Sequence, residues 1–101
     1  MFTKGFDPAI LPDKFQKHGA DFKVTTALEY EQMADKFLGG PKSRTARQRV
    51  RAKDGHILRF DINTDEFGIL APSGEIMTYY KPDPAIHRQA NNLVYFLKKC
   101  K

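Results

Sequence analysis

The stretch from residue 44 to residue 81 constrains the fold most, because its apolar and polar side chains alternate and turn residues interrupt the alternation. Alternation of this kind is typical of strands that bury one face. The turns are expected at Asp54-Gly55, Asn63-Thr64-Asp65 and Pro72-Ser73-Gly74, whose residue types suit tight reversals. We therefore predict an antiparallel meander of four strands, over about residues 44–52, 56–61, 66–71 and 75–81.

The residues before Pro41 predict helices instead. Thr26 with Glu29 three residues later forms a capping box, and apolar residues follow at helical period until Gly39. This pattern predicts a helix over residues 27–38. Pro12 and the residue after it suit a helix entrance, so a shorter helix is expected over residues 13–18.

Together these elements predict one α+β domain over residues 1–101, with N-terminal helices packed on one face of a four- to five-stranded antiparallel sheet. Helix 27–38 is the natural cover for a sheet face that carries Leu58, Phe60, Phe67 and Ile69. The domain divides into an irregular leader (1–12), a helical part (13–40), the sheet (44–81) and a C-terminal tail (82–101). Residues 91–99 of the tail suit a helix or a fifth strand, and a helix is favoured.

Composition excludes several classes of protein. No apolar run approaches the roughly 20 residues that a membrane span needs, so this chain carries no membrane anchor of that kind. The start MFTKGFDPAI has no long apolar stretch of the signal-peptide type. Cys100 is the single cysteine, which rules out an internal disulfide and a thiol cluster for zinc.

The positive charge is concentrated in one fifth of the chain. The chain has a net charge of +5. Residues 41–60 hold seven Lys and Arg against Asp54 alone, a net of +6, whereas the flanking segments are close to neutral. Alternation places Arg47, Arg49 and Arg51 on one face of the first strand. Such a patch indicates nucleic acid, an anionic membrane surface or an acidic protein as partner, unless it is simply a solvated strand face.

The distribution of ionisable residues limits the kinds of catalysis that the chain can support. The histidines at positions 18, 56 and 87 stand far apart in sequence, the acids are scattered, and no Gly-rich phosphate loop or nucleophile elbow occurs. No metal or cofactor is expected. Acid/base catalysis remains, and RNA cleavage by the substrate's own 2′-hydroxyl needs only a base, an acid and donors around the phosphorane.

His18 is the candidate for that acid/base group. Lys14, Lys17 and His18 fall on one face of the helix over residues 13–18. Histidine titrates in the range that proton transfer requires, and a neighbouring lysine favours the neutral ring. A lone histidine near a helix end is more often a structural cap, so this pattern alone does not establish catalysis.

Four ordered blocks of sequence carry a family resemblance: KHGADF (17–22), EYEQMADKFL (29–38), LRFDINTDEFGI (58–69) and GEIMTYYKP (74–82). They resemble the tRNase toxin domains at the C-termini of contact-dependent inhibition proteins. These domains are similar to colicin D and belong to the barnase, EndoU, colicin and RelE-like nuclease group. The resemblance covers about residues 12–84 and implies helices packed on an antiparallel sheet, which agrees with the fold predicted above.

The resemblance also implies site residues. The KH-x-x-DF block makes His18 the catalytic histidine and Lys17 its cationic neighbour, and the closing strand adds Thr78 and Tyr80. Lys81 follows them as a phosphate contact. The remaining candidates for substrate binding depend on charge and alternation alone: Lys14, Arg47, Arg49, Arg51 and Arg59.

The resemblance further implies a tRNA substrate, a metal-independent reaction that leaves a 2′,3′-cyclic phosphate, and a cognate immunity protein, expected to be acidic. It implies that the domain ends a larger secreted or surface delivery protein and acts in the cytoplasm of a target bacterium. Two alternatives stay open from the residues themselves. One is a non-catalytic RNA-binding module, and the other is an interaction domain for an acidic protein, both using the Arg47–Arg51 face.

Overall fold

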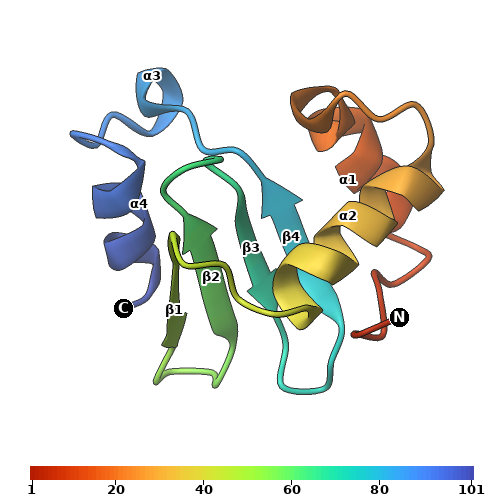
Figure 1. Ribbon diagram of the computed structural model, residues 1–101, viewed down its shortest axis with the longest axis horizontal. Helices are drawn as coiled ribbons and strands as arrows, with labels where there is room; N and C mark the ends of the chain where they lie inside the picture. Colours follow the sequence, from red (N-terminus) through yellow and green to blue (C-terminus); the bar gives the residue numbers. More distant parts are fainter.

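The computed structural model describes residues 1–101 and confirms the predicted α+β fold (Figure 1). Helix α1 (Leu11–His18) leads into a 3₁₀ turn (Gly19–Phe22) and then into helix α2 (Ala27–Gly39). The four strands are β1 (Ala46–Val50), β2 (Ile57–Asp61), β3 (Phe67–Leu70) and β4 (Ile76–Tyr80). The tail forms a short helix α3 (Pro84–His87) and a longer helix α4 (Asn92–Lys99). None of these helices has the length and apolar character that crossing a membrane requires.

The sheet is an antiparallel meander in the order β1-β2-β3-β4. One irregularity lies in β4, where Leu70 pairs with Ile76 but Ile69 pairs with Thr78. The extra residue, Met77, forms a bulge, so Ile76 and Thr78 point to opposite faces. Simple alternation along β4 therefore does not give its faces correctly. Tyr79 joins Ile76 on one face, and Tyr80 joins Thr78 on the other.

Helix α2 covers the face of the sheet that carries Ile76 and Tyr79. Its buried side chains Tyr30, Ala34 and Leu38 form a core cluster with those two residues, together with Phe6 and Phe22. The Tyr30 hydroxyl donates a hydrogen bond to the Tyr79 carbonyl. Leu38 packs so closely on Gly68 that a Cβ at that glycine would lie 2.9 Å from the leucine methyl groups. The absence of a side chain at Gly68 therefore lets α2 approach β3.

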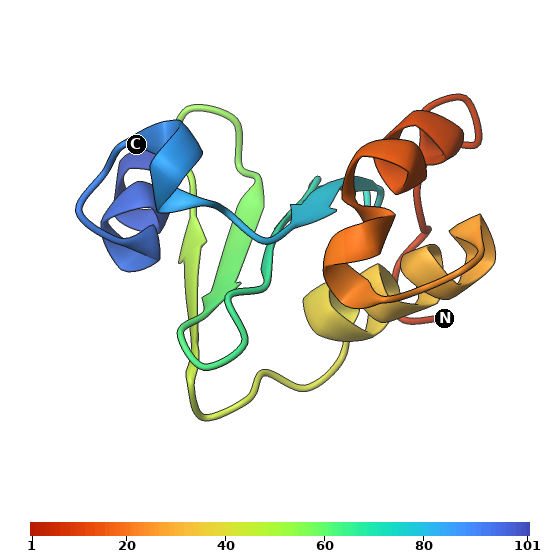
Figure 2. The same cartoon turned by 90° about the horizontal axis from the view of Figure 1, so that it is seen from above.

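Helix α4 covers the opposite face, which carries Leu58, Phe60 and Phe67. Phe96 of α4 is fully buried against these three residues. The expectation that helix 27–38 covers this face is wrong, because both sheet faces are apolar over part of their area and the C-terminal tail supplies the second cover. Figures 1 and 2 show α4 beside the β1–β2 end of the sheet, and α1 and α2 beside the β3–β4 end.

The leader is held to α2 and to the edge of β4. Phe6 is buried and forms an isolated parallel bridge with Ile76. The Asp35 carboxylate accepts hydrogen bonds from the backbone of Phe2 and Thr3, and Glu31 accepts one from the backbone of Phe6. These contacts fix the entry to α1, which begins five residues after Phe6.

Candidate active-site cleft

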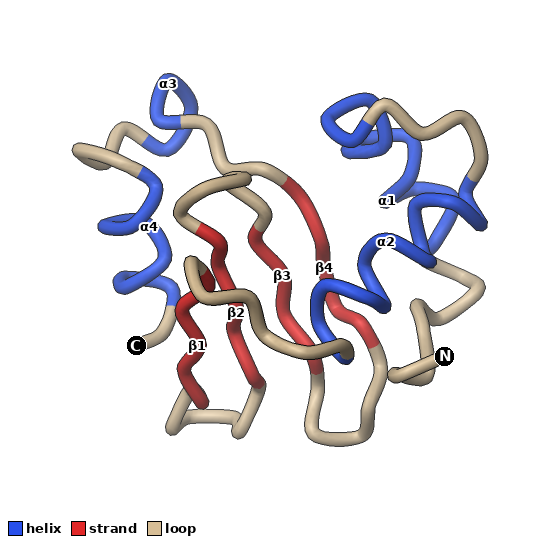
Figure 3. Tube along the Cα trace, viewed as in Figure 1, coloured by secondary structure: helices blue, strands red, loops and turns tan.

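A cleft of about 360 Å³ lies where α1, the end of β4 and the C-terminal tail meet. In Figure 3 the loop that leaves β4 runs between the side of the molecule that holds α1 and the side that holds α3. Lys17, His18 and Asp21 line the cleft from the N-terminal side, and Tyr80 and Lys81 line it from β4 and the residue after it. His87 and Tyr95 line it from the tail. The fold thus brings four of the predicted site residues together: Lys17, His18, Tyr80 and Lys81.

The His18 ring is oriented by stacking. It lies against the Tyr80 ring with the centroids 5.0 Å apart and the planes 24° from parallel. Burial lowers the pKa of His18, nearby Lys14 and Lys17 lower it further, and Asp21 partly opposes them. No protein group forms a hydrogen bond with the imidazole nitrogens, so both remain free for a substrate. Stacking and electrostatics together present a neutral imidazole that can accept a proton.

The Tyr80 hydroxyl forms a hydrogen bond with the hydroxyl of Tyr95 on α4. Burial raises the pKa of Tyr80, and the bond to Tyr95 raises it further. The phenol is therefore protonated throughout the physiological pH range. Two hydroxyls carry two protons, and their mutual bond uses one of them. The other proton has no acceptor in the protein, so the pair can donate a hydrogen bond to a bound anion.

His87 has both ring nitrogens occupied. The Gln89 backbone N–H donates to Nδ1 at 3.0 Å, and Nε2 lies 2.8 Å from the Asn92 side-chain oxygen. An accepting Nδ1 leaves Nε2 to carry the proton, which fixes one neutral tautomer. The ring also stacks on Tyr95 with the centroids 4.3 Å apart. His87 therefore supports the cleft wall, whereas His18 has the free nitrogens.

Asn92 ties three separate segments to that wall. Besides contacting His87, its side-chain nitrogen donates to Asp65 in the β2–β3 turn at 3.1 Å. The same nitrogen donates to the Pro82 carbonyl at 3.0 Å. The Asn92 side-chain amide thus fixes the positions of the tail, the exit from β4 and the β2–β3 turn relative to one another.

The cations near His18 differ in how free they are. Lys17 forms an ion pair with Asp13 at 3.2 Å, but both side chains are well exposed and such a pair is weak. Lys81 lies over the Phe22 ring, 5.5 Å from its centroid. Lys14 does not line the cleft and acts on His18 through its charge. A bound phosphate can therefore be contacted by Lys17 and Lys81.

Thr78 lies on the same sheet face as Tyr80 but does not line the cleft. It is half-buried and pairs with Ile69 on β3, one strand inward from the sheet edge. The structure therefore places Tyr80 in contact with His18, whereas Thr78, two residues earlier in β4, lies outside the cleft.

The four predicted arginines occupy three different environments. Arg47 and Arg49 are exposed on β1 and pair across the sheet with Phe60 and Leu58, so they share the face that α4 covers. Arg51 forms an ion pair with Asp54 at 2.8 Å and donates to the Lys99 carbonyl at 3.1 Å. Both partners fix the end of α4 against the β1–β2 turn.

Arg59 lies on the opposite face and is buried. Its guanidinium donates to the carbonyls of Phe37 at 2.7 Å and Gly40 at 3.0 Å, at the end of α2. It also donates to the Gln48 side chain at 2.8 Å. Arg59 is thus separated from the basic face of Arg47 and Arg49, and its hydrogen bonds cap α2.

A cavity of similar size, about 380 Å³, lies between α2 and the sheet and is lined in part by Arg59 and Asp61. Burial raises the pKa of Asp61, but hydrogen bonds from Thr45 and Ser43 and from two backbone amides outweigh it, so the pKa is lowered overall. The charged groups Arg59 and Asp61 are thus already bonded within the protein. The cleft at His18, whose imidazole nitrogens are free, is therefore the candidate site.

The residues that sequence reasoning missed come mainly from the tail: His87, Asn92 and Tyr95, together with Asp21 of the 3₁₀ turn. Asp21 stands three residues after His18, a spacing from which a charge effect on the imidazole was foreseeable. The tail residues carried no comparable signal, because their approach to Tyr80 depends on how α4 packs on the sheet. No group of three or more His, Cys, Asp and Glu side chains is arranged to hold a metal ion.

Comparison with known proteins identifies the fold. No protein-family model matches the chain. No curated protein matches it either. Among solved structures, the chain is similar to a ribonuclease from Escherichia coli complexed with its inhibitor protein, with a TM-score of 0.59 and 20% sequence identity. The match covers 86% of this chain and 95% of that one, so the chain has the fold of a bacterial ribonuclease.

Proposed function

We propose that this protein is an RNA endonuclease toxin that cleaves tRNA without a metal ion. The observation that carries the proposal is the His18 imidazole, which has free nitrogens and stacks on Tyr80 in a cleft bordered by Lys17 and Lys81. The likeness to a bacterial ribonuclease supports it at the level of the fold.

In this reaction the neutral His18 imidazole takes the proton of the substrate's 2′-hydroxyl. The 2′-oxygen then attacks the adjacent phosphorus, the bond from phosphorus to the 5′-oxygen breaks, and that oxygen takes a proton from water in the open cleft. The products are a 2′,3′-cyclic phosphate and a 5′-hydroxyl end. The lowered pKa of His18 favours the base role, because more of the imidazole is neutral at a given pH.

The neighbours of His18 stabilise the charge that builds up on the phosphorane. The ammonium groups of Lys17 and Lys81 supply positive charge, and the Tyr80–Tyr95 pair supplies one hydroxyl proton that has no acceptor in the protein. Thr78 does not line the cleft and makes no contact with the phosphate in this scheme. The exposed Arg47 and Arg49 contact phosphates farther along the RNA.

The proposal includes a biological setting. A producer of such a toxin needs protection, so we propose a cognate immunity protein of acidic character that fills the cleft; the similar ribonuclease was solved with an inhibitor protein. We further propose that the domain is delivered by a larger secreted or surface protein of contact-dependent inhibition and acts in the cytoplasm of the target bacterium.

The test is incubation of purified protein with total tRNA, with and without EDTA, followed by mapping of the new 3′ ends. Cleavage to cyclic-phosphate ends that survives EDTA is expected. His18→Ala should abolish it, and His56→Gln, which changes a histidine outside the cleft, should not. Binding without cleavage would favour a non-catalytic RNA-binding module, and neither binding nor cleavage would favour a docking domain for an acidic protein.

A further inference from the structure

Residues 84–101 of the C-terminal tail carry cations and no acidic side chain. From Pro84 to Lys101 the chain has no Asp or Glu, but it has Arg88, Lys98, Lys99 and Lys101. Lys98 and Lys99 are exposed, and neither forms an ion pair. Lysines in the last turn of a helix stabilise the helix through attraction to the negative end of its dipole. That interaction does not require the ammonium group to point in a particular direction. Here the Lys99 ammonium lies over the Tyr95 ring, 5.5 Å from its centroid.

A second hollow lies next to the cleft, and these two lysines line it. It has a volume of about 350 Å³ and is lined by His87, Gln89, Tyr95, Lys98 and Lys99. His87 and Tyr95 also line the cleft that holds His18. The stacked His87–Tyr95 pair is therefore a wall shared by the two hollows, with the candidate catalytic base on one side and two free ammonium groups on the other.

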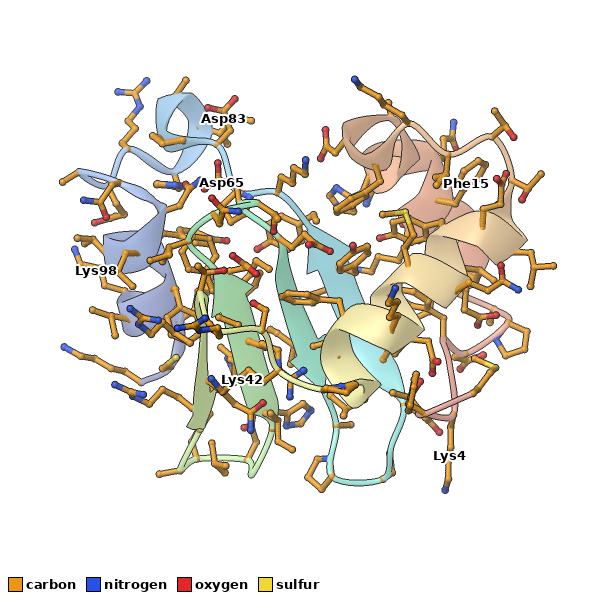
Figure 4. All side chains as sticks on the ribbon, in the orientation of Figure 1. Lys4, Phe15, Lys42, Asp65, Asp83 and Lys98 are labelled. Atoms are coloured by element: carbon orange, nitrogen blue, oxygen red, sulfur yellow. The ribbon has the colours of Figure 1, made fainter.

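The exposed arginines of β1 extend the positive surface beyond α4. Arg49 pairs with Leu58 on the sheet face that α4 covers through Phe96, and Arg51 donates to the Lys99 carbonyl at the end of α4. Arg51 is held by Asp54 and by the Lys99 carbonyl, but Arg49 has no carboxylate partner. Figure 4 shows Lys98 on the outer side of α4, at the opposite end of the molecule from Lys4.

We propose that Lys98, Lys99 and Arg49, here called the α4 track, bind the phosphates of an RNA strand whose scissile phosphate lies at His18. This inference rests on the proposed function and deepens it, because it says where the substrate runs after it leaves the cleft. The strand passes the His87–Tyr95 wall and follows α4 towards the edge of the sheet at β1.

Two features favour RNA over an acidic protein as the occupant. The cations follow a path that starts at the cleft, as a flexible strand held at its scissile bond requires. Aromatic rings stand at the junction, and cationic grooves with aromatic side chains are typical of surfaces that bind single-stranded nucleic acid. The cleft at His18 is small enough that a long RNA extends past it on at least one side.

The experiment measures kcat/KM on RNA oligonucleotides of increasing length around the mapped cleavage point. For the wild type, kcat/KM should rise with length as the strand reaches the α4 track. Lys98→Gln/Lys99→Gln should cleave the shortest substrates normally but gain little from added length, with a loss of about tenfold on the longest. Lys4→Glu lowers the net charge by the same two units and should keep the wild-type length dependence.

Binding provides a second readout that does not need cleavage. In a His18→Ala background, fluorescence anisotropy with a long oligonucleotide should show a salt dependence whose slope falls by about 1.4 when both lysines are replaced, since each phosphate contact on a single strand contributes roughly 0.7. Lys4→Glu should leave that slope unchanged.

Several results would overturn the inference. Equal losses at every substrate length would mean that the lysines act on the cleft or on folding, and unchanged kcat/KM and salt slope would mean that RNA does not reach α4. If the wild type cleaves no RNA, the proposed function fails, and the salt slope of binding alone then decides whether the α4 track is an RNA surface.

Discussion

The His18 imidazole and the Tyr80 ring stack with their centroids 5.0 Å apart, which joins the end of α1 to the end of β4. Tyr80 is held in turn by the Tyr95 hydroxyl on α4. The orientation of a histidine near the N-terminus of the chain therefore depends on a helix at its C-terminus.

The acidic limb of the pH–activity profile should move in opposite directions in two variants. The His18 pKa lies below its ordinary value, with Lys14 lowering it and Asp21 raising it. As a general base His18 must be neutral, so kcat/KM falls as pH drops through this pKa. Lys14→Gln should move the midpoint of the fall to higher pH, and Asp21→Asn should move it to lower pH. Midpoints that coincide with the wild type in both variants would exclude His18 as the titrating base.

The Tyr80 and Tyr95 hydroxyls should show strong coupling in a double-mutant cycle. Tyr80→Phe or Tyr95→Phe alone leaves one half-buried hydroxyl without its partner, at a cost of about 1 kcal/mol in the free energy of unfolding. The double variant removes both hydroxyls, so its cost should be clearly smaller than the sum of the two. Urea unfolding measures all four proteins. Simple additivity would mean that the hydrogen bond contributes nothing to stability.

Activity should separate the same two tyrosines. Tyr80→Phe removes the hydroxyl of the ring that stacks on His18, and we expect kcat to fall about 10- to 100-fold, as for loss of a donor to the transition state. Tyr95→Phe leaves the Tyr80 hydroxyl free to donate to the phosphate, so its effect on kcat should be smaller. Steady-state kinetics on one oligonucleotide compares them, and an equal or larger loss in Tyr95→Phe would mean that Tyr80 is not the tyrosine that donates to the phosphate.

The elements of this fold were predictable from local patterns, but their assembly was not. The Thr26–Glu29 capping box and the turn residues between strands act within a few residues of themselves, and the helix and strands formed as expected. Alternation defines two faces of a strand without saying which helix covers each face. It also cannot foresee the bulge at Met77, which shifts Ile76 away from the face of Thr78.

The residues of the candidate site also fall into two groups, those indicated by local sequence and those brought together only by packing. His18, Lys17, Tyr80 and Lys81 were found because they stand in recognisable blocks of sequence. His87, Asn92 and Tyr95 were missed because only the packing of Phe96 against the sheet brings α4 to the cleft. Sequence charge also grouped two arginines that the fold separates. Arg47 is exposed on β1, whereas Arg59 is buried and hydrogen-bonded at the end of α2.

Arg59 and Arg47 should therefore differ sharply in their effect on stability. Arg59→Met removes the donor from the Phe37 and Gly40 carbonyls and from Gln48, so the free energy of unfolding should fall by about 3 kcal/mol. Arg47→Met, at an exposed position on the same sheet, should change it by less than about 0.5 kcal/mol. Urea unfolding of both variants gives the comparison, and similar values would contradict a structural role for Arg59.

Neighbouring asparagines at the start of α4 offer a matched test of how the tail supports the cleft. Asn91 caps the helix by accepting a hydrogen bond from the Val94 backbone N–H at 2.9 Å, and its replacement by alanine should cost about 1 kcal/mol of stability. Asn92 instead holds His87, Asp65 and the Pro82 carbonyl, so Asn92→Ala should loosen the wall formed by His87 and Tyr95. We expect Asn92→Ala to raise KM for a long oligonucleotide several-fold at temperatures where both variants are folded. Asn91→Ala should keep the wild-type KM, because its lost hydrogen bond lies within α4 alone, and an equal rise in both variants would mean that KM follows helix stability and not the Asn92 contacts.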